Sequence, residues 1–257
     1  MDVKLKEGVN AGDRQVATVN GVEFAFRWCP PGTFIMGSPE SENDRNDDET
    51  QHQVTLTKGF WIMETEVTQK QWKAVMEYNP SYYKEDDDSP VNSVSWNDCQ
   101  EFCQTCTQLG LPVQLPTEAQ WEYACRAGSV TAYFWGDDLS KEGRANCWSP
   151  WFPPTTPQEE ALDWTIDWST RVTKYPPNPW GIYDMHGNVS EWCQDWYGKY
   201  SDEHVTDPTG PSHGLGRIFR GGSWKNFAAD CRSACRQGDI PEYQNEDIGF
   251  RCVGIID

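Results

Sequence analysis

Cysteine is the residue type of this chain with the most specific chemistry. The 257 residues include 10 cysteines, too many for a typical cytosolic enzyme and too few for a scaffold held mainly by disulfides. Cys99, Cys103 and Cys106 are spaced i, i+4 and i+7, so a helix would carry them on one face. A metal site and a set of small core-facing side chains both match that spacing. The core interpretation is favoured, because no histidine lies near them in the sequence.

Residues 217–253 are the other stretch whose residue types suggest a function. The stretch opens with R-I-F-R-G-G-S-W and closes with I-G-F-R-C-V, and the residues between are polar and have no period. The two ends predict strands, at 220–224 and 248–252, with glycines where backbones approach closely. A loop this long inside a domain is uncommon unless it is functional or disordered. We therefore interpret the stretch as a surface presented by a scaffold that holds its ends.

Short strands and capped helices are expected to form that scaffold. Alternation of apolar and polar residues predicts strands at 22–28, 33–37, 54–57 and 59–64. A threonine or serine N-cap opens each predicted helix, and these helices are expected at 68–76, at 95–110 and from 117 onward. Between 128 and 185 the chain is rich in Gly, Pro, Trp, Asn and Asp and predicts no regular element.

The composition predicts a core of large rings and argues against several kinds of partner. The net charge is -19, which argues against nucleic acid and anionic membranes, because phosphate binding needs clustered lysine and arginine. No apolar run approaches the ~20 residues of a membrane span. The 14 tryptophans indicate a core built from rings rather than from long helices. The acidic loop at 38–53 lacks the ligand spacing of an EF-hand, so we interpret it as a solvated loop.

Seven short blocks, in order along the chain, resemble one family. They are P-P-G-T-F-I-M-G-S at 30–38, T-K-G-F-W-I-M-E-T-E-V-T at 57–68, P-V-N-S-V-S-W-N-D at 90–98, L-P-T-E-A-Q-W-E-Y-A-C-R-A-G at 115–128, D-M-H-G-N-V-S-E-W at 184–192, R-G-G-S-W at 220–224 and G-F-R-C at 249–252. Together they resemble the formylglycine-generating-enzyme, or sulfatase-modifying-factor, family. The resemblance covers nearly the whole chain and implies a variant of the C-type lectin fold. The family includes copper-dependent oxidases that convert a cysteine to formylglycine, iron-dependent sulfoxide synthases and non-catalytic ligand-binding proteins, so the fold does not decide the function.

The cysteine positions are the first means of choosing among these branches. In the oxidases of the family, two cysteines five residues apart follow the G-G-S-aromatic block and bind copper, and the matching positions here are Asn226 and Cys231. A soft copper(I) site needs both sulfurs, and Cys235 has the wrong spacing. The resemblance therefore predicts that the chain is not an enzyme and binds no copper. The alternatives are an oxidase that uses Cys231 with Cys235, and an accessory or structural subunit.

With the oxidase branch set aside, the chain resembles the non-catalytic branch, which includes the variable proteins of diversity-generating retroelements. In those proteins, copying errors at adenines change asparagine codons within the C-terminal segment. Arg232, Arg236, Trp224 and the glycines are expected to hold the backbone of this segment while other side chains bind a ligand. Lys225, Gln237 and Glu246 match such codon changes less well, and ordinary divergence is the alternative explanation. The predicted ligand-binding positions are Phe227, Asp230, Cys235, Gly238, Asp239, Ile240, Tyr243, Asn245 and Asp247.

The resemblance also implies a structural Ca²⁺ ion and a disulfide. The calcium ligands carried over by position are the Asp184 and Glu191 side chains with the Gly187 and Val189 carbonyls, a set that suits a hard cation. Capping of turns, or pairing with arginine, is the alternative role for the two carboxylates. The implied disulfide joins Cys103 to Cys252, and a disulfide would indicate export.

These observations lead to one expected architecture and one expected function. We expect residues 1–257 to form a single α+β domain with a C-type lectin-like fold of the formylglycine-generating type, loop-rich, with few helices and short strands. The expected function is non-catalytic binding of a protein or surface molecule through residues 217–253. We expect an exported or cell-surface location, with the leader absent from this chain, because the first residues are charged and do not resemble a signal peptide.

Overall fold

The computed structural model describes residues 5–84, 86–137, 144–148 and 168–256. Its strands are β1 (Arg14–Val19), β2 (Val22–Cys29), β3 (Gly32–Met36), β4 (His52–Leu56), β5 (Phe60–Met63), β6 (Val113–Gln114), β7 (Ser190–Trp196), β8 (Val205–Thr206), β9 (Arg217–Arg220), β10 (Arg236–Asp239), β11 (Ile248–Gly249) and β12 (Val253–Gly254). Its helices are α1 (Gln69–Met76), α2 (Trp96–Gln108), α3 (Glu118–Arg126) and the single 3₁₀ turn η1 (Ala228–Cys231). The predicted α+β, loop-rich class with few helices is confirmed.

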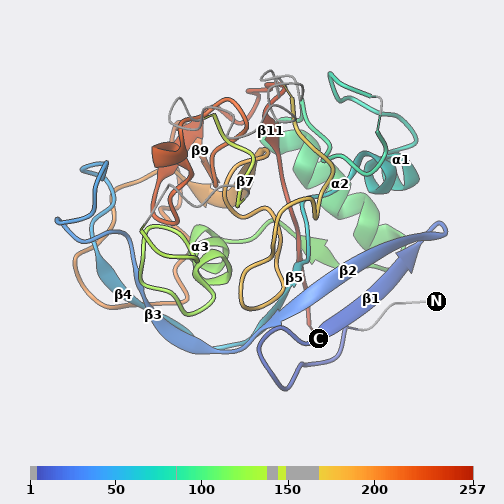
Figure 1. The fold of residues 1–257 in the computed structure, drawn as a ribbon. Helices are drawn as coiled ribbons and strands as arrows, with labels where there is room; N and C mark the ends of the chain where they lie inside the picture. Colours follow the sequence, from blue (N-terminus) through green and yellow to red (C-terminus); the bar gives the residue numbers. More distant parts are fainter. Residues whose placement is uncertain (1–4, 85, 138–143, 149–167, 257) are drawn as a thin grey trace.

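Three sheets make up the scaffold. The largest has the order β1-β2-β5-β12-β6, so the last strand of the chain is inserted between β5 and β6. A second sheet has the order β10-β9-β7-β11, and a third has the order β3-β4-β8. Figure 1 shows the β1–β2 hairpin and both chain termini at the bottom right of the view, with β9 and β11 at the opposite, upper end. The C-terminal segment is therefore displayed at one end of the molecule while β12 anchors the chain in the large sheet.

The three α-helices begin at the predicted caps. Thr68, Ser95 and Thr117 each accept a hydrogen bond from the backbone N–H three residues later, and the side-chain oxygen of that third residue accepts one from the cap N–H. These are complete capping boxes, which satisfy backbone donors that a helix end leaves unpaired. Within the described residues, none of the helices is long and apolar enough to cross a membrane.

Large rings fill the core, as the tryptophan content predicts. Trp72 of α1 stacks on Phe102 of α2, with ring centroids 5.2 Å apart and planes 12° apart, and Phe250 meets both rings edge-on. Cys99, Cys103 and Cys106 also face this cluster from α2. The core interpretation of these three cysteines therefore agrees with their placement.

The C-terminal segment has more regular structure than the sequence predicts. The first predicted strand, 220–224, is wrong: β9 ends at Arg220, and Gly221 and Gly222 follow in a turn with φ of +90° and +65°. Only glycine adopts such angles readily, and a Cβ on Gly222 would lie 2.6 Å from the Cys231 sulfur. The second predicted strand, 248–252, is reduced to β11. The unpredicted strand β10 returns antiparallel along β9.

Candidate functional site

Arg232 is the central anchor beneath the C-terminal segment. Its Nη1 donates to Glu42 Oε1 and Glu49 Oε2, and its Nη2 donates to Glu49 Oε1 and the Asp44 carbonyl, all at 2.7 Å. Its Nε donates to the Ala229 carbonyl at 2.9 Å. Burial by itself raises the pKa of Glu49, but the hydrogen bonds from Arg232 and Ser38 and the charge of Arg232 together outweigh burial, and the pKa is lowered. The acidic loop predicted to be solvated thus holds the segment from one side.

Arg220 and Arg236 form a second anchor on helix α3. Arg220 donates to Glu118 Oε1 at 2.7 Å, to Glu122 Oε2 at 2.6 Å and to the Ser233 carbonyl at 2.6 Å. Arg236 donates to both oxygens of Glu118, at 2.7 and 2.9 Å. Burial alone raises the pKa of Glu118, but the charges of Arg236 and Arg220 lower it below its ordinary value. These buried charges are paired and hydrogen-bonded, as buried charges must be.

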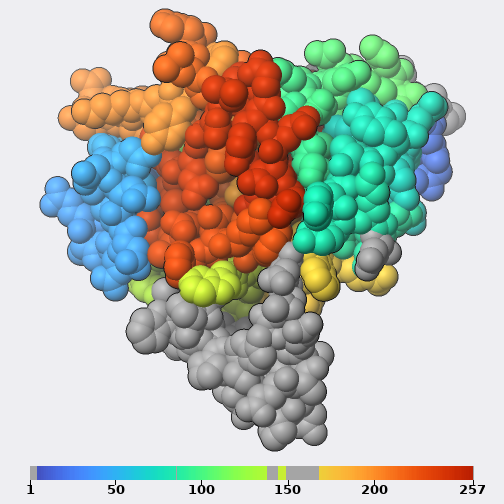
Figure 2. All heavy atoms as spheres, turned by 90° about the horizontal axis from the view of Figure 1, so that it is seen from above, coloured from blue at the N-terminus to red at the C-terminus, as the bar shows by residue number. Residues whose placement is uncertain are grey.

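The outer face of the segment carries most of the predicted ligand-binding positions. Figure 2 shows this segment, in orange and red, at the centre of one face, between the loop around residue 45 and the region around residue 75. Six predicted side chains that are exposed or half-buried define what we call the C-terminal surface: Phe227, Asp230, Asp239, Ile240, Tyr243 and Asn245.

Three other predicted ligand-binding positions do not present a side chain at this face. Cys235 and Asp247 are buried, with 3% and 8% of their surfaces exposed. Asp247 Oδ2 accepts a hydrogen bond from Ser223 Oγ at 2.7 Å, which ties it to the turn after β9. Gly238 is exposed, but a Cβ there would lie 2.8 Å from the Arg217 carbonyl oxygen. These contacts restrict which substitutions the three positions tolerate.

Trp148 extends the C-terminal surface with a residue from another part of the chain. Its backbone N–H donates to the Asn226 carbonyl at 2.9 Å. Its ring meets Phe227 edge-on, with centroids 4.4 Å apart and each side chain about half exposed. The sequence analysis missed Trp148, because it lies 79 positions before Phe227 in a stretch without a period. The only available signal was an aromatic residue in a polar, loop-forming stretch.

The cysteines near the segment are arranged differently from the expected pair. Asn226, in the first family position, uses its side-chain oxygen to accept hydrogen bonds from the Ser223 N–H and hydroxyl, at 2.9 and 2.7 Å. The Cys231 thiol donates to the Phe227 carbonyl at 3.6 Å, and a side-chain hydrogen bond between Cys231 and Cys147 lowers the pKa of Cys147. The same bond, together with burial, raises the pKa of Cys231. Two thiols are therefore in contact although one family position is asparagine.

His186 lies beside this cysteine region. Its Nδ1 is 2.7 Å from the Cys231 carbonyl, and its Nε2 accepts a bond from the Phe134 N–H at 3.3 Å. Nδ1 therefore carries the proton and donates to the carbonyl. Burial lowers the pKa of His186 to about 4, so the ring is neutral at physiological pH and holds the backbone of Cys231.

The predicted calcium ligands lie in the turn before β7 and at the start of that strand, and Glu191 is already paired. Both oxygens of Glu191 accept hydrogen bonds from Arg251, each at 2.6 Å, and Oε2 also accepts from Trp121 Nε1 at 2.8 Å. Asp184 accepts from the Thr173 N–H at 2.9 Å. This arrangement matches the alternative role, in which a carboxylate pairs with arginine.

Another carboxylate near Asp184 has an oxygen without a partner. Asn188 Nδ2 donates to Glu66 Oε1 at 2.9 Å, while the buried Glu66 Oε2 has no hydrogen-bond partner. Gly187 and Val189, whose carbonyls complete the predicted set, are buried in the same turn. Within the described residues, no group of three or more His, Cys, Asp or Glu side chains is placed to hold a metal ion. The predicted set also uses two backbone carbonyls, so calcium binding there stays a prediction.

Cys103 and Cys252 approach each other as the family resemblance implies. Their sulfurs are 3.7 Å apart, in contact but not bonded. Cys103 and Cys106 are also separated by two residues, a spacing used in zinc and redox motifs. Both are buried in the core, with 4% and 0% of their surfaces exposed. The disulfide stays a prediction, and the two α2 cysteines show no exposed redox motif.

Comparison with known proteins relates this site to one family. Residues 23–256 match the Sulfatase-modifying factor enzyme 1-like domain. A formylglycine-generating enzyme of Bos taurus is 38% identical over 173 residues, 65% of this chain and 44% of that protein. The one of Streptomyces coelicolor is 37% identical over 176 residues, 65% of this chain and 53% of that protein. The chain therefore spans about half the length of the curated relatives it matches.

Two solved structures are similar over nearly their full lengths. Treponema denticola variable protein 1 superposes with a TM-score of 0.82 at 27% identity, over 94% of this chain and 98% of that one. PvdO from Pseudomonas aeruginosa gives a TM-score of 0.81 at 24% identity, over 97% of this chain and all of that one, which is a likeness of fold alone. These matches confirm the family resemblance and the C-type lectin-like fold.

The prediction that the chain is not an enzyme is wrong. Relatives named formylglycine-generating enzyme, at 37–38% identity, relate the chain to an enzyme family. Another relative, 32% identical, is named inactive C-alpha-formylglycine-generating enzyme 2, so the family alone does not assign an activity. That prediction depended only on the cysteine positions that follow the G-G-S-W block. It could not anticipate that Cys147, distant in sequence, contacts Cys231.

Proposed function

We propose that this chain, which belongs to the Sulfatase-modifying factor enzyme 1-like family, binds a protein or surface molecule through its C-terminal surface. The observation that carries the proposal is the division of residues 217–253 into two faces. Arg220, Arg232 and Arg236 are buried and bound to carboxylates of the scaffold, while the side chains of the C-terminal surface are at least partly exposed. A backbone held in this way can display different outer side chains without losing its shape.

The outer side chains suit recognition of another macromolecule. Phe227 and Ile240 are about half exposed, at 51% and 53%, and large apolar groups of this kind serve as anchors at interfaces. Tyr243 and Asn245 add polar contacts, and paratopes use the same residue types. Asp230 and Asp239 give the surface a negative charge, which favours a partner with positive groups.

The similarity to Treponema denticola variable protein 1 supports a further part of the proposal, that these outer positions are diversified. The test is to sequence the region around the gene for a reverse transcriptase and a near-copy of codons 217–253. A near-copy that differs mainly at the adenines of the codons for the C-terminal surface is the expected result. If neither element is present, the diversification is rejected and only binding by a fixed surface remains.

Binding itself is tested with matched variants of the intact chain. Surface proteins captured by the wild-type chain are identified and purified. The dissociation constant of each for the chain is then measured. We expect the double variant Phe227→Ala and Ile240→Ala to bind at least roughly tenfold more weakly, because it removes two apolar anchors. Val130→Ala, which truncates a 78%-exposed residue elsewhere, is the control. Equal affinity of the double variant and the wild type would reject the C-terminal surface as the binding site.

A second candidate function is a formylglycine-generating type of cysteine oxidation, favoured by the contact between Cys147 and Cys231. Two adjacent thiols supply the soft ligands that copper(I) prefers, and copper bound there would supply the capacity to activate oxygen. Trp148 follows Cys147 in the chain, and its ring meets that of Phe227, whose carbonyl lies 3.6 Å from the Cys231 sulfur. In this candidate, the anchors under the segment hold the two sulfurs together.

Copper titration and turnover distinguish this candidate from ligand binding alone. A tight 1:1 copper(I) complex, together with oxidation of a cysteine-containing peptide, is expected if the thiol pair is catalytic. Cys147→Ser and Cys231→Ser should each abolish both signals. Cys235→Ser should leave them intact, whereas loss in this variant would favour the pairing of Cys231 with Cys235. No tight copper binding by the wild-type chain would eliminate the oxidase candidate.

The cell-surface location belongs to the same proposal as macromolecular binding. Its test is mass mapping of the protein from its native source under non-reducing conditions. A bond between Cys103 and Cys252, whose sulfurs are 3.7 Å apart, is expected for an exported chain. Free thiols at both positions would remove this support.

A further inference from the structure

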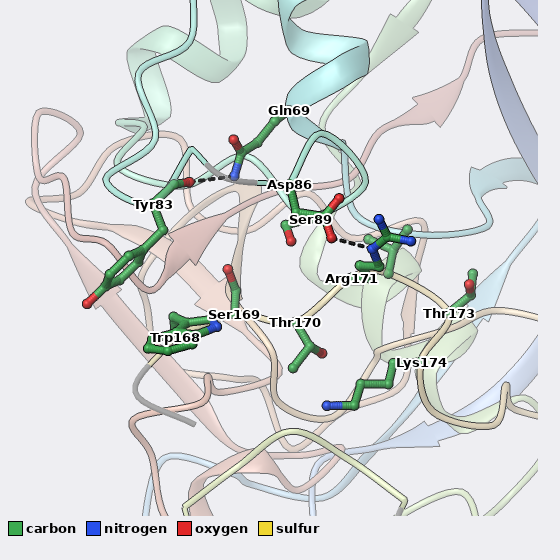
Figure 3. Close-up of a pocket in the computed structure, with 11 residues that line it drawn as sticks. Gln69, Tyr83, Asp86, Ser89, Trp168, Ser169, Thr170, Arg171, Thr173 and Lys174 are labelled. Atoms are coloured by element: carbon green, nitrogen blue, oxygen red, sulfur yellow. Dashed lines mark hydrogen bonds and ion pairs between the residues drawn. The ribbon is translucent and has the colours of Figure 1, made fainter. Parts of the chain in front are cut away.

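A pocket of about 620 Å³ lies apart from the residues of the C-terminal surface. One side comes from α1 and the loop that follows it, with Gln69, Tyr83, Asp86 and Ser89, and the other side comes from residues 168–174. Figure 3 shows the rings of Tyr83 and Trp168 at one end of the pocket and the side chains of Arg171 and Lys174 at the other. Its volume is within the range of small-molecule sites, about 300–1,000 Å³.

The aromatic end of the pocket offers a stacking surface. The rings of Tyr83 and Trp168 have centroids 5.7 Å apart and planes inclined by 46°. Trp168 nevertheless keeps 47% of its surface exposed. An indole half covered by one ring has area left for a second ring, and offset aromatic pairs are favourable beyond the area they bury. Gln69 Nε2 donates to the Tyr83 carbonyl at 2.8 Å, which fixes the backbone behind the Tyr83 ring.

The floor of the pocket contains a hydroxyl without a hydrogen bond. Thr170 is 9% exposed, and its Oγ1 is buried and has no partner. The backbone N–H of Thr170 donates to Asn188 Oδ1 at 2.8 Å, so the residue cannot easily turn away. A buried polar atom left unpaired is unfavourable, and such an atom in a native structure often meets a water molecule or a ligand.

The charged end of the pocket leaves one cation uncommitted. Arg171 pairs with Asp86 and lies 4.0 Å from Asp88, so its guanidinium is already committed to carboxylates. Lys174 makes no ion pair within the described part of the chain, and its ammonium lies 5.6 Å from the centroid of the Tyr175 ring. In a chain with a net charge of -19, an unpaired lysine at the edge of a pocket favours an anionic group there.

We propose that this pocket binds a small molecule that combines a flat aromatic ring with one anionic group. The ring stacks on Trp168, the anion pairs with Lys174, and a polar atom of the ligand satisfies the Thr170 hydroxyl. Neither the C-terminal surface nor the thiol pair contributes a residue to this site. The inference therefore stands or falls separately from the proposed function.

The experiment measures binding of 2-naphthoate to the intact chain by calorimetry, with two matched probes. 2-Naphthamide keeps the rings but has no charge, and cyclohexanecarboxylate keeps the charge but has no aromatic ring. We expect 2-naphthoate to bind with a dissociation constant of about 1 mM or lower, and each matched probe to bind roughly tenfold more weakly. Added salt should weaken only the binding of the charged probes.

Two substitutions assign that binding to the pocket. Trp168→Ala should weaken the binding of 2-naphthoate roughly tenfold, and Trp168→Phe should restore part of the lost affinity. Lys174→Gln should abolish the preference for 2-naphthoate over 2-naphthamide. Lys199→Gln, which alters an exposed lysine outside the pocket, is the control and should leave the binding of 2-naphthoate unchanged. Circular dichroism confirms that each variant is folded.

The proposal would be overturned by absence of 2-naphthoate binding up to about 5 mM, by equal binding of 2-naphthoate and 2-naphthamide, or by unchanged binding in folded Trp168→Ala. Tighter binding of 2-naphthylmethylammonium than of 2-naphthoate would also overturn it, because a cation would then prefer the aromatic end. The double variant Phe227→Ala and Ile240→Ala should bind 2-naphthoate normally, so failure of the C-terminal surface as a binding site leaves this result unaffected.

Discussion

The C-terminal segment has an inner face and an outer face that differ in burial and in the pairing of their side chains. On the inner face, Arg220, Arg232 and Arg236 are at most 5% exposed and are bound to carboxylates. On the outer face, Phe227 and Ile240 are about half exposed. The comparison teaches that the same segment combines a backbone under strong constraint with side chains under little constraint. That combination is what a surface with changeable specificity requires.

Removing Arg232 should have the largest effect, because it tests whether the inner face holds the segment. Arg232→Met leaves Glu42 and Glu49 buried without their partner, and we expect a loss of about 3–5 kcal/mol in the free energy of unfolding. Urea denaturation measures the loss. The control is Arg171→Met, which breaks an exposed pair with Asp86 and should cost at most about 1 kcal/mol. Similar losses in the two variants would erase the distinction between the inner face and an ordinary surface.

The second prediction concerns the pH dependence of the inner face. Asp195 accepts a hydrogen bond from the Glu118 N–H at 2.9 Å, and burial, followed by the charge of Glu118, raises its pKa from 3.8 to about 7. Between these values the folded state binds more protons than the unfolded state, so stability should fall as the pH rises from about 4 to about 7. The size of the fall is about 2–4 kcal/mol.

Asp195→Asn checks the cause of that pH dependence. An amide cannot ionise, and its oxygen can still accept the bond from the Glu118 N–H, so this contribution to the slope of unfolding free energy against pH should disappear. Asp202→Asn, at an exposed position, should retain the slope of the wild type. If Asp195→Asn also retained the wild-type slope, the buried carboxyl group would not be its source.

The third prediction tests the freedom of the outer face. Phe227→Ala should change the free energy of unfolding by about 1 kcal/mol or less, because the side chain is half exposed and loses mainly its contact with Trp148. Thermal unfolding measures the change. A loss comparable to that of Arg232→Met would mean that Phe227 is structural, and the separation of the two faces would fail at this residue.

The smallest effect is expected at the pair of Lys225 and Glu246, which lie on the outer side 3.0 Å apart with about a third of each side chain exposed. Lys225→Gln should change the free energy of unfolding by about 0.5 kcal/mol or less, since exposed pairs contribute little and salt screens them. Urea denaturation at low and high salt checks both points. A larger, salt-independent loss would extend the constrained region to this edge of the segment.

Local patterns identified much of the scaffold before the tertiary structure was considered. The caps at Thr68, Ser95 and Thr117 and the alternation that gave β2 to β5 depend on residues within a few positions of one another. The strands at the ends of the C-terminal segment were harder to predict. Gly221 and Gly222 end β9 through their backbone angles, which a strand-like sequence pattern does not reveal. β10 was missed because R-Q-G-D has no apolar alternation, and only its pairing with β9 makes it a strand.

The sequence alone determined the family and the C-type lectin-like fold, because both rest on ordered blocks and capped elements whose signals are local. It also located the segment that carries the candidate site. Tertiary structure decided which side chains of that segment face outward, that Trp148 joins Phe227, and that Cys147 contacts Cys231. It also brought Trp168 and Lys174 to the same pocket as Tyr83. These pairings join residues far apart in the chain, and only the packing of the folded scaffold fixes such distances.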